Sequence, residues 1–248
     1  MSIAGKHVIM DLIESWPDSV LVILRTNQEL IKQYLDEEKR VELLGREDIE
    51  IRYFPPLNPH KQQYLEVDQV INEILMGQSF VGFHATRLTQ SEISNIIRDG
   101  LQPLTPELVK EKAGILLRDN YISASEAELI IQNNSSQEEN REKMVWLFHC
   151  ISTLKDRGSL INLFSYWGGE AIYRHFQGDL YSSPDLKQIG QPCIVVCSLP
   201  GAEMESIQTI SDRMIRYWSS LQSLEPHSCE FDHFVKHTVE VIEIISIG

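Results

Sequence analysis

The pattern of apolar and polar positions divides the first quarter of the chain into two short apolar runs and one helical repeat. The runs at 19–25 and 49–54 are rich in β-branched or aromatic residues, which favours strands, and the residues at 27–44 are spaced as in a helix. A proline-rich stretch at 55–60 then interrupts the pattern, as a linker does. We therefore predict that residues 1–60 form an N-terminal extension, a small βαβ-like appendage.

The remainder of the chain alternates between strand and helix patterns. Strands are predicted at 79–85, 144–150, 193–199 and 238–247, and helices at 62–76, 89–100 and 203–222. Residues 105–140 are predicted to be mainly helical, with a surface loop or mobile segment at 133–140. The run at 193–199 has no polar alternation, so this strand should lie inside a sheet with both faces covered. The last strand changes phase near Val241 and Ile242, which predicts either a β-bulge or a strand with two buried faces. The expected fold class is mixed α/β (α+β), with a central mixed sheet and surrounding helices.

Composition narrows the range of functions. The chain has 248 residues, 42% of them hydrophobic, which is enough for a folded core, and its net charge of −14 argues against strong binding to duplex nucleic acid. Asp11 and Glu14 interrupt the N-terminal apolar stretch, and no run of 18 apolar residues occurs, so neither a signal peptide nor a membrane span is expected. Four scattered cysteines fit a reduced compartment, and the predicted localisation is cytoplasmic.

The first candidate for chemistry is the segment that contains His84, Thr86 and Arg87, at the end of the strand predicted from residue 79. A His at the end of an apolar strand can be held rigidly, and the planar guanidinium of Arg87 is suited to phosphate oxygens. Thr89 and Glu92 have the spacing of a capping box for the helix that follows. In the structural alternative, His84 bonds to the backbone and Arg87 lies on the surface.

The second candidate is Trp167-Gly168-Gly169-Glu170, directly before a helical pattern. The two glycines permit positive φ angles or close backbone approach, and free N–H groups at a helix start favour an anion. Glu170 at the same helix start is stabilised by the helix dipole. In the structural alternative, Trp167 packs in the core, the glycines bend the chain and Glu170 caps the helix.

Residues 83–104, FHATRLTQSEISNIIRDGLQPL, combine a strand that carries a His, a helix and a Gly-Leu-x-Pro turn at Gly100–Pro103. This segment resembles the opening strand and helix of ADP-ribosyltransferase-like proteins. The resemblance implies that residues 61–248 form a domain with a central sheet of ADP-ribosyltransferase type. It also implies that NAD is bound as a substrate, with His84 as the residue that anchors it.

The same resemblance implies the roles of the other candidates. Glu170 would be the catalytic carboxylate acting with His84, and the NAD-binding residues would be His84, Thr86, Arg87, Trp167, Gly168 and Gly169. In that family the Glu lies on a late strand or in the loop before it, whereas Glu170 is predicted to begin a helix. A third family element, a Tyr or Ser on the second core strand, has two candidate matches: Tyr121 with Ser123, or residues of the strand predicted at 144–150. Ser123 is also placed to cap a helix.

Three functions follow from these patterns. The first is a NAD-dependent mono-ADP-ribosyltransferase or a related NAD-cleaving enzyme, whose acceptor molecule the sequence does not identify. The alternative is a non-catalytic module that binds a nucleotide or a partner. A nuclease or RNA-modifying protein is disfavoured because Lys and Arg number only 22.

No metal site is predicted. Four metal-ligand residue types do cluster near the C-terminus, namely His227, Cys229, His233 and His237. If residues from 234 onward form a strand, positions four apart are about 13 Å from each other, too far to share one ion. A polar loop that leads into a strand is the simpler interpretation.

Overall fold

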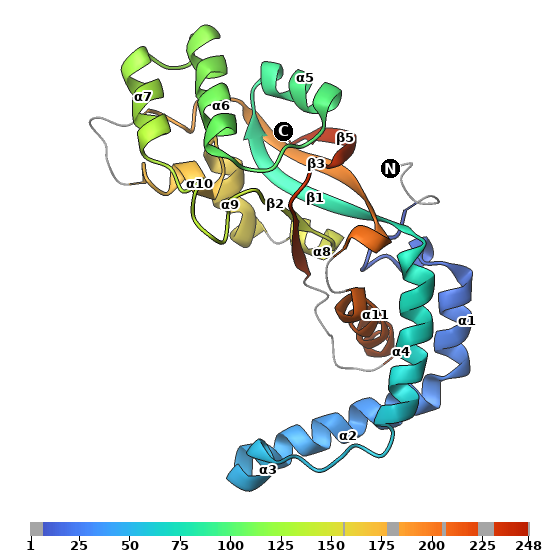
Figure 1. Ribbon diagram of the computed structural model, residues 1–248. Helices are drawn as coiled ribbons and strands as arrows, with labels where there is room; N and C mark the ends of the chain where they lie inside the picture. The colour runs from blue at the N-terminus through green and yellow to red at the C-terminus, as the bar shows by residue number, and fades with distance from the viewer. Residues whose placement is uncertain (1–6, 156, 178–183, 205–206, 223–230, 248) are drawn as a thin grey trace. The chain divides into compact units, whose positions relative to one another are not determined.

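The computed structural model describes residues 7–155, 157–177, 184–204, 207–222 and 231–247 (Figure 1). Within these residues the chain forms eleven α-helices and a five-stranded antiparallel sheet, which confirms the predicted combination of helices and strands. The elements fall into two compact units, Met1–Ser79 with Pro200–Cys229, and Phe80–Leu199 with Glu230–Gly248. These units differ from the predicted division into 1–60 and 61–248, because helices from distant parts of the chain share the first unit.

The first unit is helical in its described part. Its elements are η1 (Ile13–Ser15), α1 (Asp18–Thr26), α2 (Gln28–Glu47), α3 (Ile49–Tyr53), α4 (Lys61–Met76), η2 (Gly201–Glu203) and α11 (Ile207–Ser220). Helix α4 packs against α1, α2 and α11. No helix in the described ranges has the length and apolar character required to cross a membrane.

Two predicted strands in this unit are wrong. The run at 19–25 lies in α1, where Val20 and Leu24 are buried one turn apart while Val22 is 57% exposed. The run at 49–54 forms the short helix α3. Both apolar runs thus bury one helical face, and the predicted βαβ-like appendage is instead a set of helices.

A polar junction fixes α2 and α11 to α4. The rings of Tyr34 and Tyr64 stack with centroids 3.8 Å apart, and the Tyr64 hydroxyl donates to Asp212 at 2.6 Å. Arg216 donates to both Asp212 and Glu38 at 2.7 Å. Because these groups satisfy one another, the helices can bury polar atoms at their contact without loss of hydrogen bonds.

The second unit contains the sheet, whose strands lie in the order β4 (Asp232–Val235), β2 (Val145–Phe148), β1 (Ser79–Leu88), β3 (Gln191–Pro200), β5 (Glu240–Ser246). β2 runs antiparallel to β1 and β4, and β3 runs antiparallel to β5. The expected mixed sheet is therefore antiparallel. The connection at 89–144 begins and ends at the same end of the sheet. β2 therefore runs beside β1 in the opposite direction.

Two predictions about the strands are confirmed. β3 lies between β1 and β5, inside the sheet, as its continuous apolar run indicates. The register between β3 and β5 shifts: Val196 is opposite Glu243, whereas Cys197 is opposite Val241. Ile242 is the extra residue of the predicted bulge, and the bulge accounts for the change of phase in the sequence.

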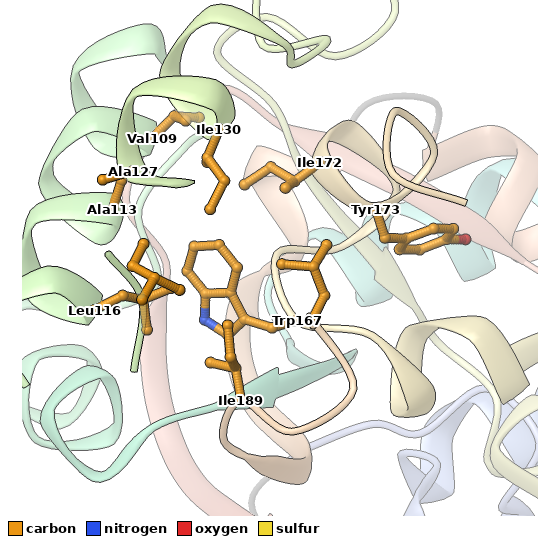
Figure 2. Packing of buried hydrophobic residues seen from close by; sticks show 11 residues of the cluster. Val109, Ala113, Leu116, Ala127, Ile130, Trp167, Ile172, Tyr173 and Ile189 are labelled. Carbon is orange, nitrogen blue, oxygen red and sulfur yellow. The ribbon is translucent and has the colours of Figure 1, made fainter. Parts of the chain in front are cut away.

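Six described helices belong to this unit, and several of them enclose a hydrophobic cluster. They are α5 (Gln90–Asp99), α6 (Pro106–Arg118), α7 (Ala124–Gln132), α8 (Ile151–Lys155), α9 (Arg157–Ser165) and α10 (Glu170–Tyr173). Figure 2 shows the Trp167 ring among aliphatic side chains of α6, α7 and α10, including Leu116, Ile130 and Ile172. Trp167 has no exposed surface. It therefore fastens the segment before Glu170 to the helices.

Candidate active site

His84 lies on β1 with its side chain partly exposed. Its Nδ1 is 2.9 Å from the main-chain oxygen of Trp146 on β2. Since a carbonyl oxygen only accepts, Nδ1 carries the proton and Nε2 keeps a lone pair. Burial, and after it the positive charge of Lys112, lower the pKa of His84, so the ring is neutral at pH 7. The backbone bond is the one expected from the structural alternative, and it leaves Nε2 able to accept from a ligand hydroxyl.

Arg87 is three residues further along β1, so the alternation of the strand directs it to the face opposite His84. Its guanidinium donates to three main-chain oxygens, those of Ile189 at 2.9 Å, Phe164 at 2.9 Å and Gly190 at 2.5 Å. A guanidinium has five N–H groups, and two remain for other partners. Arg87 thus clamps the chain on both sides of the Trp167–Glu170 segment to the end of β1.

Thr86 and Trp167 are buried, with 4% and 0% of their surface exposed. The indole N–H of Trp167 donates to Glu92 at 2.9 Å, and the ammonium of Lys112 lies 3.1 Å from the same carboxylate and over the indole ring. Trp167 therefore packs as in the structural alternative, and a contact between its side chain and NAD stays a prediction.

The two glycines before Glu170 both have positive φ, 90° at Gly168 and 66° at Gly169. A Cβ at Gly168 would lie 2.8 Å from the Cβ of Ile172, so the position excludes larger residues, whereas Gly169 faces open space. Glu170 then begins α10, as predicted from the sequence. Because α10 has only four residues, its macrodipole is small, and the surroundings of Glu170 depend on side chains.

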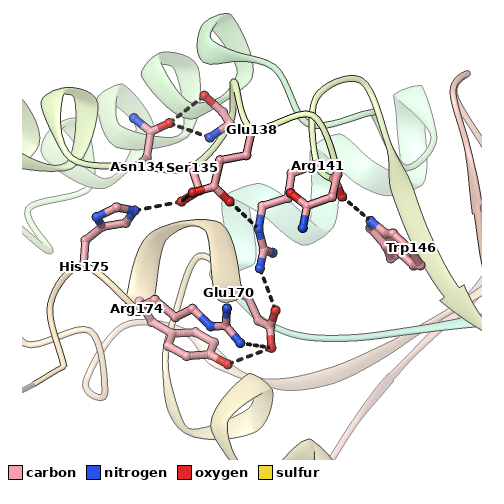
Figure 3. Close-up of polar contacts among 11 residues, drawn as sticks. Asn134, Ser135, Glu138, Arg141, Trp146, Glu170, Arg174 and His175 are labelled. Carbon is pink, nitrogen blue, oxygen red and sulfur yellow. Dashed lines mark hydrogen bonds and ion pairs between the residues drawn. The ribbon is translucent and has the colours of Figure 1, made fainter.

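Glu170 is a partly exposed carboxylate among basic groups (Figure 3). Its Oε2 accepts from Arg141 at 2.9 Å, and its Oε1 lies 3.5 Å from both Arg174 and the Tyr173 hydroxyl. The Glu170 side chain is 39% exposed, compared with 15% for Arg141 and 60% for Arg174. One oxygen is therefore held firmly, and the other has only long contacts.

A second layer of polar residues surrounds Arg141. Its Nε is 3.2 Å from Glu138, whose other oxygen accepts from the Ser135 hydroxyl at 2.6 Å. Ser135 is in turn 2.9 Å from Nε2 of His175. The bond from Ser135, and after it the one from Arg141, lower the pKa of Glu138, so this carboxylate stays ionised at neutral pH.

A series of contacts links His84 to Glu170. The Trp146 residue that accepts from His84 donates its own indole N–H to the main-chain oxygen of Asn140 at 3.2 Å. Arg141 follows Asn140 and binds Glu170. The two predicted catalytic residues are thus connected through β2 and this dipeptide, and their action on one substrate stays a prediction.

The remaining candidates have structural positions. Ser123 forms a capping box with Glu126 at the start of α7, so the capping alternative is confirmed, and Tyr121 is 46% exposed before it. His227 and Cys229 lie outside the described residues. His233 lies on β4 and His237 beyond its end. Among the residues that the structure describes, no group of three or more His, Cys, Asp or Glu side chains could hold a metal ion.

Comparison of the chain with protein-family models, with curated proteins and with solved structures finds no match.

Sequence reasoning missed Arg141 as the partner of Glu170. The residues around it, 133–143, have the composition of a polar surface loop. The available signal was the spacing of Glu138 and Arg141, three residues apart, which is typical of an ion pair on a helical turn. The contact to Glu170 spans 29 residues and leaves no local pattern.

Proposed function

We propose that this chain is a NAD-cleaving enzyme of the ADP-ribosyltransferase type, with Glu170 as the catalytic carboxylate. The observation that carries the proposal is the geometry of Glu170. The side chain is 39% exposed, so a ligand can reach it, yet its Oε2 is held at 2.9 Å by a largely buried arginine. A carboxylate that is both accessible and fixed is suited to stabilise positive charge that develops on a bound substrate.

The proposed reaction breaks the bond between the nicotinamide nitrogen and C1′ of the adjoining ribose. Both electrons of that bond leave with nicotinamide, and the ribose acquires oxocarbenium character. Water or an acceptor nucleophile then forms the new bond to C1′ and loses its proton. Because positive charge on the ribose is larger in the transition state than in bound NAD, Glu170 would accelerate the step rather than only bind the substrate.

The states of His84 and Arg87 support two binding roles. The unprotonated Nε2 of His84 would accept from a ribose hydroxyl, since Nδ1 is already occupied by the Trp146 carbonyl. Arg87 has two N–H groups left for a pyrophosphate oxygen. Because its side chain points to the face of β1 opposite His84, an NAD molecule bound by both residues would have to pass around the end of this strand. Close approach of the pyrophosphate to the backbone would be easiest at Gly169, where a side chain would meet no neighbour.

Release of nicotinamide from NAD by the wild type and by Glu170→Gln tests the catalytic role. The substitution keeps the size of the side chain and removes its charge, so we expect turnover to fall at least about 10²-fold with a smaller change in KM. The matched control is Glu126→Gln, which alters a carboxylate in the first turn of another helix, α7. Unchanged turnover in Glu170→Gln would reject the role of this residue.

The Arg87→Ala variant provides a second test. We expect weaker NAD binding, measured by calorimetry, because a phosphate donor is lost. The variant should also have a lower Tm, because three backbone oxygens lose their donor. Unchanged NAD affinity together with the lower Tm would leave Arg87 with a structural role only.

The alternative function is a module that binds a nucleotide or a partner without cleaving it. The ion pairs of Glu170 with Arg141 and Arg174 favour this alternative, because they are also what a structural carboxylate makes. It predicts that Glu170→Gln lowers the Tm and that the wild type binds NAD or a related nucleotide without releasing nicotinamide.

A further inference from the structure

Arg141 lies between two carboxylates and binds each through a different nitrogen. Nη2 donates to Glu170 at 2.9 Å, and Nε lies 3.2 Å from Glu138. Two bonds from different nitrogens of a planar guanidinium fix its orientation as well as its position. A point charge such as a lysine ammonium would fix neither.

The two arginines around Glu170 differ in burial. The Arg141 side chain is 15% exposed and its contact to Glu170 is short, whereas Arg174 is 60% exposed and 3.5 Å away. Water screens an exposed ion pair, and the flexible side chain loses conformational entropy when it forms the pair. The contact of Arg141 with Glu170 should therefore be much stronger than that of Arg174, although both arginines have the same charge.

The groups behind Arg141 hold it in place. Glu138 is kept ionised by the hydroxyl of Ser135, which is itself bonded to His175 (Figure 3). The main chain before Arg141 is fastened to β2 by the indole N–H of Trp146. Both the backbone and the head group of Arg141 are thus fixed before any ligand arrives.

We propose that Arg141 is a positioning residue, which holds Oε2 of Glu170 and leaves Oε1 directed toward the substrate. This inference rests on the proposed function. Arg141 itself touches no reacting atom and acts only through Glu170. A displacement of about 1 Å at a catalytic group can lower a rate about 10²-fold, so the loss of this support should be visible in kcat.

The experiment compares Arg141→Met, Arg141→Lys and Arg174→Met, each measured in the wild-type chain and together with Glu170→Gln. Nicotinamide release from NAD gives kcat and KM. We expect Arg141→Met to lower kcat at least about 10-fold with little change in KM, and Arg174→Met to change kcat less than about 3-fold. Arg141→Lys keeps the positive charge but lacks the planar guanidinium, so its kcat should fall between those of Arg141→Met and the wild type.

The combination with Glu170→Gln separates positioning from a general structural effect. If Arg141 acts through Glu170, Arg141→Met should have almost no further effect on kcat once Glu170→Gln is present. An equal loss of kcat in both backgrounds would overturn the proposal, as would equal losses from Arg141→Met and Arg174→Met.

Failure of the proposed function has a separate signature. A wild type that neither binds NAD nor releases nicotinamide would reject the proposed function. It would also reject any role of Arg141 in catalysis. A wild type that releases nicotinamide, with kcat unchanged in Arg141→Met, would reject only the positioning role. The urea unfolding midpoints of all variants, recorded in parallel, identify any variant whose loss of turnover reflects loss of the fold.

Discussion

At the scale of single residues, His149 shows how burial sets the chemistry of a side chain. It follows β2, has no exposed surface, and lies 2.9 Å through Nδ1 from the main-chain oxygen of Val81. Burial, and to a lesser extent the neighbouring His233, lower the pKa of His149 to about 4. The ring is thus kept neutral inside the second unit at neutral pH, and its protonation is disfavoured in the folded chain.

This low pKa predicts that acid weakens the protein. In the unfolded chain His149 takes up a proton near pH 6.5, whereas in the folded chain it does so only near pH 4. The contribution of the neutral, buried His149 to the stability of the fold is therefore fully present above pH 6.5. It is lost as the pH falls from 6.5 to 4. We expect this residue alone to lower the free energy of unfolding by about 2 kcal/mol between pH 7 and pH 5, as measured by urea unfolding.

The control for this prediction is His149→Gln, which keeps a donor for the Val81 oxygen and does not titrate. Its stability should be lower than that of the wild type at pH 7 but less dependent on pH. If both proteins lose the same stability between pH 7 and pH 5, His149 is not the group responsible.

At the scale of elements, α5 and α7 begin with the same capping box in different surroundings. Thr89 with Glu92 and Ser123 with Glu126 make equivalent backbone bonds. Glu92 is 3% exposed and also binds Trp167 and Lys112, whereas Ser123 and Glu126 are on the surface. The first box therefore joins three elements, and the second only starts a helix.

Substitution of each capping Glu by Ala measures this difference. Glu126→Ala should lower the free energy of unfolding by about 1 kcal/mol, the usual effect of a lost cap. Glu92→Ala should lower it by about 3 kcal/mol, because it also leaves the buried indole N–H and the Lys112 ammonium without a partner. Equal effects in denaturant unfolding would show that Glu92 only caps α5.

The capping boxes were predictable because each bond joins a side chain to its own helix start. The run at 19–25 was not, since a short β-branched stretch fits a strand or a buried helix equally well, and only packing against α4 decides. Helix α3 depends on close packing on α2, where a Cβ at Gly45 would lie 3.2 Å from the Cα of Arg52. The periodicity of the sequence does not indicate this close packing of α3 on α2. It does not indicate the contact of Arg141 with Glu170 either.

At the scale of the whole molecule, the chain divides into two compact units. Leu24 of α1 is fully buried in the first unit. Leu24→Ala should lower the stability of that unit by about 2 to 5 kcal/mol, because it leaves a cavity. In hydrogen exchange we expect the amides of α1, α4 and α11 to lose protection while those of β1, β2 and β3 keep theirs. Equal loss in both sets would mean that the chain unfolds as one cooperative unit.

The pairing of α4 with α11 also has a consequence for synthesis on the ribosome. Tyr64 and its partner Asp212 are 148 residues apart. At about 5 to 20 residues per second, translation of that interval takes roughly 7 to 30 s. During this time α4, whose Ile71 and Leu75 are fully buried in the finished protein, has no α11 to pack against. The nascent chain therefore presents an apolar helix face to chaperones until its last quarter has been made.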